Sequence, residues 1–278
     1  MKLQAQAGKW SDLGIRTASS LALIPLVLAD IWFGGIWLVM LATLLGVVMA
    51  FEWASIVNAS DPLQFTLMAA SALVAGVLPG NVAIIFILAC IAGLALLSLW
   101  RSSMHEKRSR WSGIGPLYVG LPILALVVLR QDPAFGLEAI MWIIGIVWAA
   151  DIMAYFAGRA IGGPKLAPVL SPKKTWAGLG GAVFGAALAS LVFGAYAMGS
   201  VVWPLVILGG VFAVIEQGGD ILESMLKRQH GVKDSGRLIP GHGGIIDRVD
   251  GLVAVAVAAL TVGLLRNSSA PATGLLIW

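Results

Sequence analysis

The fold is decided by a pattern that is clearest in Leu137-Glu-Ala-Ile-Met-Trp-Ile-Ile-Gly-Ile-Val-Trp-Ala-Ala-Asp151-Ile-Met-Ala-Tyr155-Phe-Ala157. Apart from Glu138 and Asp151, this run carries no charged residue. An α-helix needs about 20 consecutive apolar residues to cross the hydrocarbon core of a bilayer. The run therefore predicts a transmembrane helix with an acidic residue near one end.

The composition of the whole chain agrees with this pattern. Of its 278 residues, 59% are apolar and only 12% are charged, whereas a soluble domain has roughly 25% charged residues. A soluble fold of this length would lack the polar residues for its surface. The first dozen residues are polar and no short apolar run ends in a cleavage site, so we expect the first span to be retained.

The same length requirement predicts an all-α, polytopic membrane protein of about nine transmembrane helices. They are expected near residues 17–30, 33–51, 64–80, 82–100, 114–131, 137–157, 176–199, 202–222 and 249–265. We divide them into an N-terminal transmembrane region, residues 1–135 with about five helices, and a C-terminal catalytic region, residues 136–278 with about four.

The lysines and arginines are distributed unevenly between the two sides of such a membrane protein. With the N-terminus inside, 16 of the 18 lie on the inner side, and only Arg130 and Arg266 lie outside. By the positive-inside rule the N-terminus is cytoplasmic and the C-terminus is outside. The net charge of +4 is therefore attributed to topology, and no nucleic acid is expected as a partner.

The first polar stretch begins at Asp151 and continues into Ser171-Pro-Lys-Lys-Thr-Trp176. Asp151 and Tyr155 are one helical turn apart, on one face, and an ionisable residue inside a span is by default a functional candidate. Adjacent lysines and hydroxyls before a helix N-terminus favour phosphate binding. The alternatives are that Asp151 only pairs with Arg159 or a lysine, and that Ser171 to Thr175 form an ordinary basic loop.

The second polar stretch covers residues 216–250 and is richer in acids. Three carboxylates and a lysine follow one helix stripe at four-, three- and four-residue spacing; they are Glu216, Asp220, Glu223 and Lys227. Asp247 and Asp250 share a face at the start of the last span. Carboxylates from two neighbouring helix ends suit a hard divalent cation such as Mg²⁺.

Basic residues and glycines surround these acids. Together with acids that could hold a metal, they are the components of phosphoryl or nucleotidyl transfer. The alternative is a salt-bridge network that closes the inner helix ends. In the Pro240-Gly-His-Gly-Gly244 segment, His242 could be a phosphate donor, a general acid or a structural residue.

The run from Ser224 to Asp250 closely resembles the characteristic motif of the phosphatidate cytidylyltransferases, also called CDP-diacylglycerol synthases. The matching positions are Ser224-x-x-Lys227-Arg228-x4-Lys233-Asp234-x-Gly236-x2-Ile239-Pro240-x-His242-Gly243-Gly244-x2-Asp247-Arg248-x-Asp250. The segments around Asp151 and Ser171, Gly219-Asp220, Glu52 and Tyr118-Val-Gly-Leu-Pro122 are similar to that family as well. The likeness extends from about Arg16 to about Leu265.

The resemblance implies that CTP and phosphatidic acid react to CDP-diacylglycerol and pyrophosphate, with Mg²⁺ as cofactor and the number of ions left open. It also implies a homodimer in the cytoplasmic (inner) membrane, with the active site on the cytoplasmic face, in phospholipid biosynthesis. The expected metal ligands are Asp220, Asp247 and Asp250. The expected catalytic residues are Asp220, Asp247, Lys227 and Arg248. The expected substrate-binding residues are Asp151, Tyr155, Ser171, Lys173, Lys174, Thr175, Arg228, Lys233, Arg237 and His242.

The chain departs from the family pattern at Ala177, where the family usually has a glutamate after Ser-Pro-Lys-Lys-Thr-Trp. Two other functions stay open. One is a CTP-dependent kinase or cytidylyltransferase of another membrane lipid. The other, from a different class, is an ion-coupled transporter, which would place acids near the bilayer midplane with access from both sides.

Overall fold

The computed structural model describes residues 24–57, 61–104, 109–198, 201–236, 238 and 243–278. Two sequence-predicted site residues, Arg237 and His242, lie outside the described residues. The helices are α2 (Gly35–Ile56), α3 (Pro62–Val77), α4 (Ile84–Ser103), α5 (Trp111–Gln131), α6 (Gly136–Ala160), α7 (Trp176–Phe193), α8 (Trp203–Gln229), α9 (Ile246–Arg266) and α10 (Pro271–Leu276). A π-helical turn, Gly194–Met198, follows α7, and a further apolar helix covers Ile24–Phe33.

Seven helices in the described part of the chain are long and apolar enough to cross a membrane. They are α2, α4, α5, α6, α7 with its π-helical turn, α8 and α9. The segment Ile24–Phe33 and helix α3 are apolar but shorter. Each predicted span thus overlaps a helix, and the helical, polytopic class is confirmed. The count of nine crossings stays a prediction, because two of these helices are too short by this measure.

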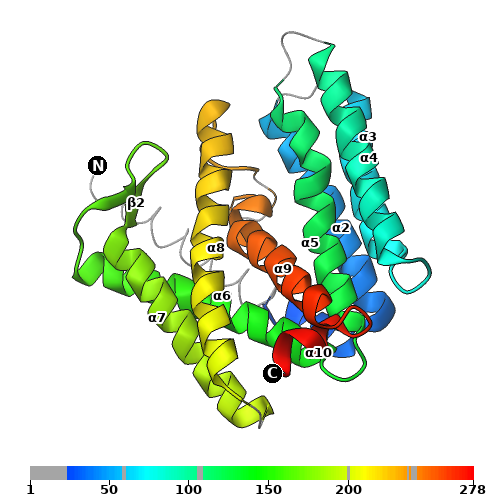
Figure 1. Cartoon of the computed structure of the whole chain (residues 1–278). Coiled ribbons are helices and arrows are strands. Elements are labelled where there is room, and N and C mark those ends of the chain that lie inside the picture. Colours follow the sequence, from blue (N-terminus) through cyan, green and yellow to red (C-terminus); the bar gives the residue numbers. More distant parts are fainter. Residues whose placement is uncertain (1–23, 58–60, 105–108, 199–200, 237, 239–242) are drawn as a thin grey trace.

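Two elements were not predicted from the sequence. Strands β1 (Lys165–Ala167) and β2 (Ser171–Thr175) form an antiparallel hairpin between α6 and α7, so the predicted loop 171–175 is instead a strand. Gly162 and Gly163, with φ of +69° and +91°, turn the chain out of α6 into this hairpin. β1 has only three residues, and β2, Ser-Pro-Lys-Lys-Thr, has no apolar residue to alternate with its polar ones apart from Pro172. The short α10 packs against α9 near the C-terminus (Figure 1).

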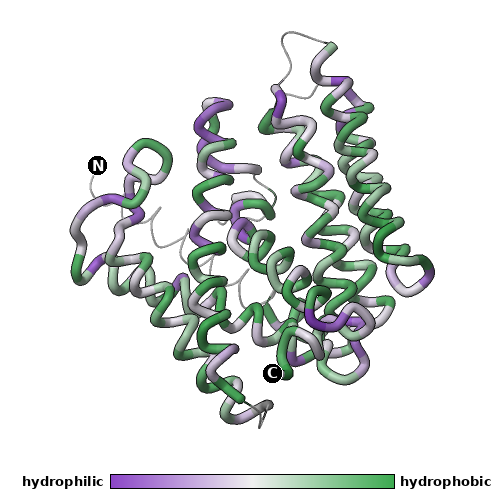
Figure 2. Tube along the Cα trace, in the orientation of Figure 1, coloured by the Kyte–Doolittle hydropathy of each residue, from purple (hydrophilic) through white to green (hydrophobic). Residues whose placement is uncertain are grey.

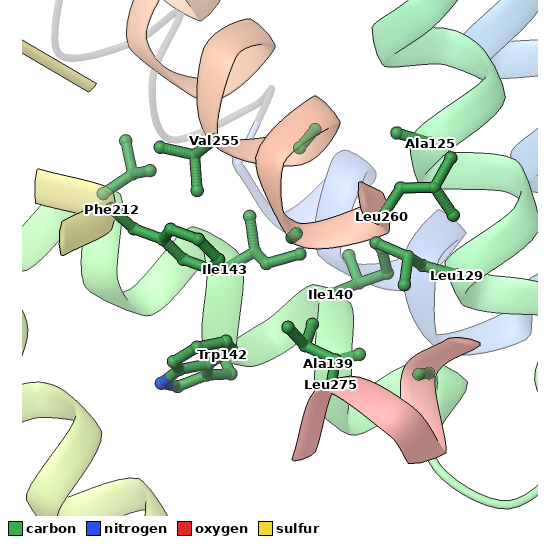
Figure 3. Packing of buried hydrophobic residues seen from close by; sticks show 14 of the residues in the cluster. Ala125, Leu129, Ala139, Ile140, Trp142, Ile143, Phe212, Val255, Leu260 and Leu275 are labelled. Carbon is green, nitrogen blue, oxygen red and sulfur yellow. The ribbon is translucent and has the colours of Figure 1, made fainter. Parts of the chain in front are cut away.

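The hydrophobic core is built from large apolar side chains of α5, α6, α8 and α9. Figure 3 shows Leu129, Ile140, Ile143, Phe212 and Leu260 pointing toward one another. One core therefore crosses the predicted division at 135/136, which itself stays a prediction. Figure 2 shows hydrophilic residues along the upper part of α8, near the start of α9 and in the hairpin. The polar stretches of the C-terminal half thus gather at one end of the helices.

Candidate active site

A pocket of ≈ 390 Å³ opens where α6, the hairpin, α7 and α8 meet. Five of the predicted site residues line it together with Asp220, although they come from stretches far apart in the sequence. Its lining residues are Asp151, Ala154, Tyr155, Gly158, Arg159, Lys173, Lys174, Thr175, Gly178, Gln217 and Asp220. The structure thereby brings the first polar stretch into contact with the beginning of the second.

The walls of this pocket are held by close packing of α7 on α6. The hydroxyl oxygen of Thr175 accepts a hydrogen bond of 3.0 Å from the Gly178 amide and caps the N-terminus of α7. A Cβ at Gly178 would lie 3.3 Å from the Ala154 carbonyl oxygen. Since helices approach this closely only where small residues face each other, the glycines of α7 determine how near the hairpin lies to α6.

Lys174 connects the hairpin to α8. Its ammonium group lies 2.6 Å from a carboxylate oxygen of Asp220 and donates a 3.4 Å hydrogen bond to the Gln217 carbonyl oxygen. Lys173, next to it, is exposed. On the α6 side, the Arg159 guanidinium donates a 2.9 Å hydrogen bond to the Tyr155 hydroxyl. The pocket therefore presents cationic groups from α6 and from the hairpin, together with the carboxylates of Asp151 and Asp220.

A second lysine, Lys227, connects α8 to the start of α9. Its ammonium group lies 2.7 Å from Glu223, one turn away, and 2.8 Å from Asp247. All three side chains are largely buried, with exposed fractions of 13%, 1% and 9%. A buried ion triad of this kind is expensive to disrupt, because removing one partner leaves an uncompensated buried charge.

Asp247 also organises the loop before α9. Its carboxylate accepts hydrogen bonds from the Ser235 amide at 3.0 and 3.1 Å and from the Gly244 amide at 2.9 Å. Gly243 beside it has φ of +86°, which an L-residue rarely adopts. The two ends of the 235–244 segment are thus tied to one carboxylate.

Glu52, near the end of α2, lies in the same network. Its buried carboxylate, 2% exposed, accepts hydrogen bonds from the Ser235 hydroxyl at 3.1 Å and from the amides of Ile245 and Ile246 at 2.8 and 2.9 Å. It therefore satisfies free amide groups at the N-terminus of α9, as a capping residue does, but from another helix. The N-terminal region supplies this group to the site.

Three carboxylates converge between α8 and α9. Among the described residues, Asp220, Glu223 and Asp250 each offer an oxygen, and these oxygens lie within 4.8 Å of one another. The Oε1 atom of Glu223 is buried and has no hydrogen-bond partner among the described residues, whereas Oε2 pairs with Lys227. Carboxylate oxygens at this spacing are the ligands that a divalent cation prefers.

The structure groups the sequence-predicted residues in two sets. Asp151, Tyr155, Lys173, Lys174, Thr175 and Asp220 line the pocket, and Ser171 begins the strand that carries the lysines. Lys227 and Asp247 form the buried triad with Glu223. Arg228, Lys233 and Arg248 belong to neither set; they lie within the long motif and are exposed. Asp247 lies outside the group of three converging carboxylates, so its predicted role as metal ligand stays a prediction.

Sequence reasoning did not assign a site role to Glu223 or Glu52. Glu223 lay in the predicted acidic stripe, so the spacing could have identified it. Glu52 is an isolated glutamate at the end of an apolar span, and no spacing pattern connects it with Ser235 or Ile246. Only the resemblance to the family singled out this position, and it gave Glu52 no role.

The fold and site together define a multi-pass helical membrane protein whose polar pocket joins basic residues to a group of carboxylates at one end of the helices. The sequence model of the cytidylyltransferase family matches residues 14–265. The chain belongs to this family and is a nucleotidyltransferase.

Curated relatives support the same assignment. The phosphatidate cytidylyltransferase of Brucella abortus (strain 2308) is 36% identical over 259 residues, which cover 91% of this chain and 94% of that protein. The phosphatidate cytidylyltransferase of Pseudomonas aeruginosa is 36% identical over 262 residues, covering 86% of this chain and 92% of that protein. The protein of the same name from Haemophilus influenzae is 41% identical over 149 residues, 52% of each chain.

Proposed function

We propose that this chain is a phosphatidate cytidylyltransferase, which joins CTP to phosphatidic acid and releases pyrophosphate. The observation that carries this proposal is the pairing of Lys174 with Asp220. It places a basic hairpin that can hold phosphates beside carboxylates that can hold a cation, at the end of membrane helices. A water-soluble nucleotide and a membrane lipid can meet only at such an interface.

The reaction needs no protein nucleophile. An oxygen of the phosphatidate phosphate attacks the α-phosphorus of CTP, a new P–O bond forms, and the bond to the β-phosphate oxygen breaks with its electrons leaving on pyrophosphate. Lys173 and Lys174 neutralise the phosphate charge, and Thr175 and Tyr155 orient the substrate in the pocket. Catalysis of this kind rests on positioning and on stabilising charge. Arg228, Lys233, Arg237, His242 and Arg248 complete the proposed phosphate-binding set.

The carboxylates fit a divalent cation, because three of their oxygens converge and one oxygen of Glu223 lacks a partner among the described residues. Asp220, Glu223 and Asp250 would hold Mg²⁺, and Asp247, which pairs with Lys227, is proposed as a further ligand. When bound, the cation neutralises phosphate charge. Lys174 and Lys227 partly balance the carboxylate charge when no cation is present.

The proposal includes the membrane arrangement. Nine crossings with a cytoplasmic N-terminus put the basic end of the helices, and the pocket with it, on the cytoplasmic face of the inner membrane. The chain acts as a homodimer in this proposal, as the family resemblance implies. CTP then reaches the pocket from the cytoplasm and phosphatidic acid from the membrane.

The test is pyrophosphate release by the purified chain in lipid or detergent, given CTP, Mg²⁺ and phosphatidic acid, with each omitted in turn. Release that needs all three components, with an equal amount of CDP-lipid, is the expected result. Release of CDP instead would indicate a lipid kinase. Absence of turnover with every lipid phosphate tried would refute the enzymatic proposal for this chain and favour the transporter.

A further inference from the structure

The hydroxyl of Tyr118 is buried beside the group of carboxylates without a hydrogen-bond partner. Tyr118 lies on α5 and is 8% exposed, and its oxygen has no partner among the described residues. Its side chain belongs to one buried cluster with Leu226 of α8 and with Ile246 and Val253 of α9, which neighbour Glu223 and Asp250 in the chain. A helix of the N-terminal region therefore packs this unpartnered hydroxyl among the residues of α8 and α9 that neighbour the carboxylates.

Aromatic packing holds the ring of Tyr118 in place. Its ring lies against that of Trp53, with ring centroids 4.5 Å apart and planes inclined by 35°, and the Trp53 indole donates a 3.0 Å hydrogen bond to the Trp111 carbonyl oxygen. Trp53 is itself 1% exposed. A ring enclosed in this way has little freedom to turn its hydroxyl toward solvent.

Two unpartnered oxygens thus occur where α5 packs on α8 and α9, one on Tyr118 and one on Glu223 itself. Buried polar groups without partners are rare, because each has lost its hydrogen bonds to water. Their occurrence at one place indicates that a bound ligand supplies the missing bonds. A cation held by carboxylates retains water molecules, and these waters are strong hydrogen-bond donors.

We propose that Tyr118 is a positioning residue of the cation site, whose hydroxyl oxygen accepts a hydrogen bond from a water on the cation held by Asp220, Glu223 and Asp250. The inference rests on the proposed use of a divalent cation. It explains why α5 presents a polar group into an otherwise acidic space. It also means that the N-terminal region contributes to the cation site through Tyr118 as well as to the loop through Glu52.

The experiment compares wild type with Tyr118→Phe, which removes only the hydroxyl and keeps the ring against Trp53. The full chain in detergent is titrated with Mn²⁺ alone, without nucleotide, and free Mn²⁺ is measured by electron paramagnetic resonance. Thermal unfolding is followed with and without Mn²⁺. Tyr196→Phe is the matched control, because Tyr196 is 88% exposed and lies outside the site.

We expect Tyr118→Phe to bind Mn²⁺ about fivefold to tenfold more weakly, as for the loss of one hydrogen bond near charge. Its unfolding temperature without Mn²⁺ should equal or exceed that of wild type, because an unpartnered buried hydroxyl is gone. The Mn²⁺-induced rise in that temperature should shrink. Tyr196→Phe should match wild type in all three measurements.

Unchanged Mn²⁺ affinity in Tyr118→Phe would overturn the inference. If the stability without Mn²⁺ is also lower, the hydroxyl has a structural role instead. If wild type binds Mn²⁺ and releases pyrophosphate while Tyr118→Phe binds equally well, only this inference fails. If wild type binds no Mn²⁺, the inference and the proposed cation site fail together.

Discussion

Lys174 pairs with Asp220 in the lining of the pocket, and replacing this lysine should affect the binding of CTP more than the stability of the fold. Lys174→Met should raise KM for CTP about tenfold, because one charged hydrogen bond to phosphate is lost. Stability should change little, since the pair is partly exposed. Steady-state kinetics and thermal unfolding check both. Lys165→Met, an exposed lysine on the other strand of the hairpin, is the control, and an equal KM in both variants would contradict the assignment.

Glu52 accepts three hydrogen bonds with two carboxylate oxygens, so its isosteric amide cannot replace it. In Glu52→Gln, the side-chain NH2 group would replace one accepting oxygen and would face an N–H or O–H donor, so at least one of these hydrogen bonds would be lost. We expect a loss of about 1–3 kcal/mol in unfolding free energy and a lower kcat, because the start of α9, which carries Asp247, loses its support. Denaturation and turnover are compared with Glu138→Gln, in the first turn of α6. Wild-type behaviour of Glu52→Gln would show that α2 does not support the loop.

At the scale of elements, the contact between α6 and α7 depends on small residues. A Cβ at Gly181 would lie 2.5 Å from both the Ala157 Cβ and the Met153 carbonyl oxygen, whereas one at Gly180 would meet nothing within 4 Å. Gly181→Leu should therefore separate the helices, lower stability by about 1–3 kcal/mol or more and abolish activity. Gly180→Leu should resemble wild type. Thermal unfolding of the Gly181→Leu and Gly180→Leu variants checks this, and equal unfolding temperatures of the two would refute the packing argument.

At the scale of the whole molecule, Asp132 joins the α5–α6 turn to the C-terminal helix α10. Its carboxylate accepts hydrogen bonds from the Thr273 amide and hydroxyl at 2.8 and 3.2 Å. Burial alone would raise the pKa of Asp132, but hydrogen bonds from Thr273, Ala134 and Phe135 lower it below the ordinary 3.8. A lowered pKa stabilises the fold above the ordinary pKa, and this contribution is lost as pH falls through the folded value.

Asp132→Asn should consequently unfold at a lower temperature than wild type at pH 7, and the difference should shrink below pH 3.8 as the wild-type carboxyl becomes protonated. Thermal unfolding across pH checks this. Ser269→Ala, which changes a hydroxyl that bonds only locally to Asn267, is the control. A constant difference at every pH would show that the charge of Asp132 is unimportant.

The orientation of the whole chain is tested at the same scale. Sixteen of the 18 basic residues lie on one side of the proposed nine-span topology, which puts the C-terminus outside. A phosphatase reporter fused after Trp278, active only outside the cytoplasm, should therefore be active. The same reporter fused after Arg110 should be inactive. The reverse pattern would place the pocket outside, away from cytoplasmic CTP.

Local patterns in the sequence were enough to predict the membrane class, the approximate helix positions and the two polar stretches of the site. Each is a local property: about 20 consecutive apolar residues suffice to predict a span, and Lys174, Asp220 and Asp247 are recognised by their neighbours in the chain. The long motif from Ser224 to Asp250 also identified the family before any contact was known. These features need no knowledge of which helices touch.

Which of these groups come into contact could be learned only from the packing of the helices. Ser235 is 183 residues from Glu52, Tyr118 packs in one cluster with residues of α8 and α9, and Lys174 reaches Asp220 through a hairpin that was not predicted. Hydropathy does not specify helix neighbours, because lipid-facing and helix-facing residues are both apolar in a membrane. The partners of each buried charge follow instead from close packing at small residues such as Gly181, and these contacts exist only once the helices are assembled.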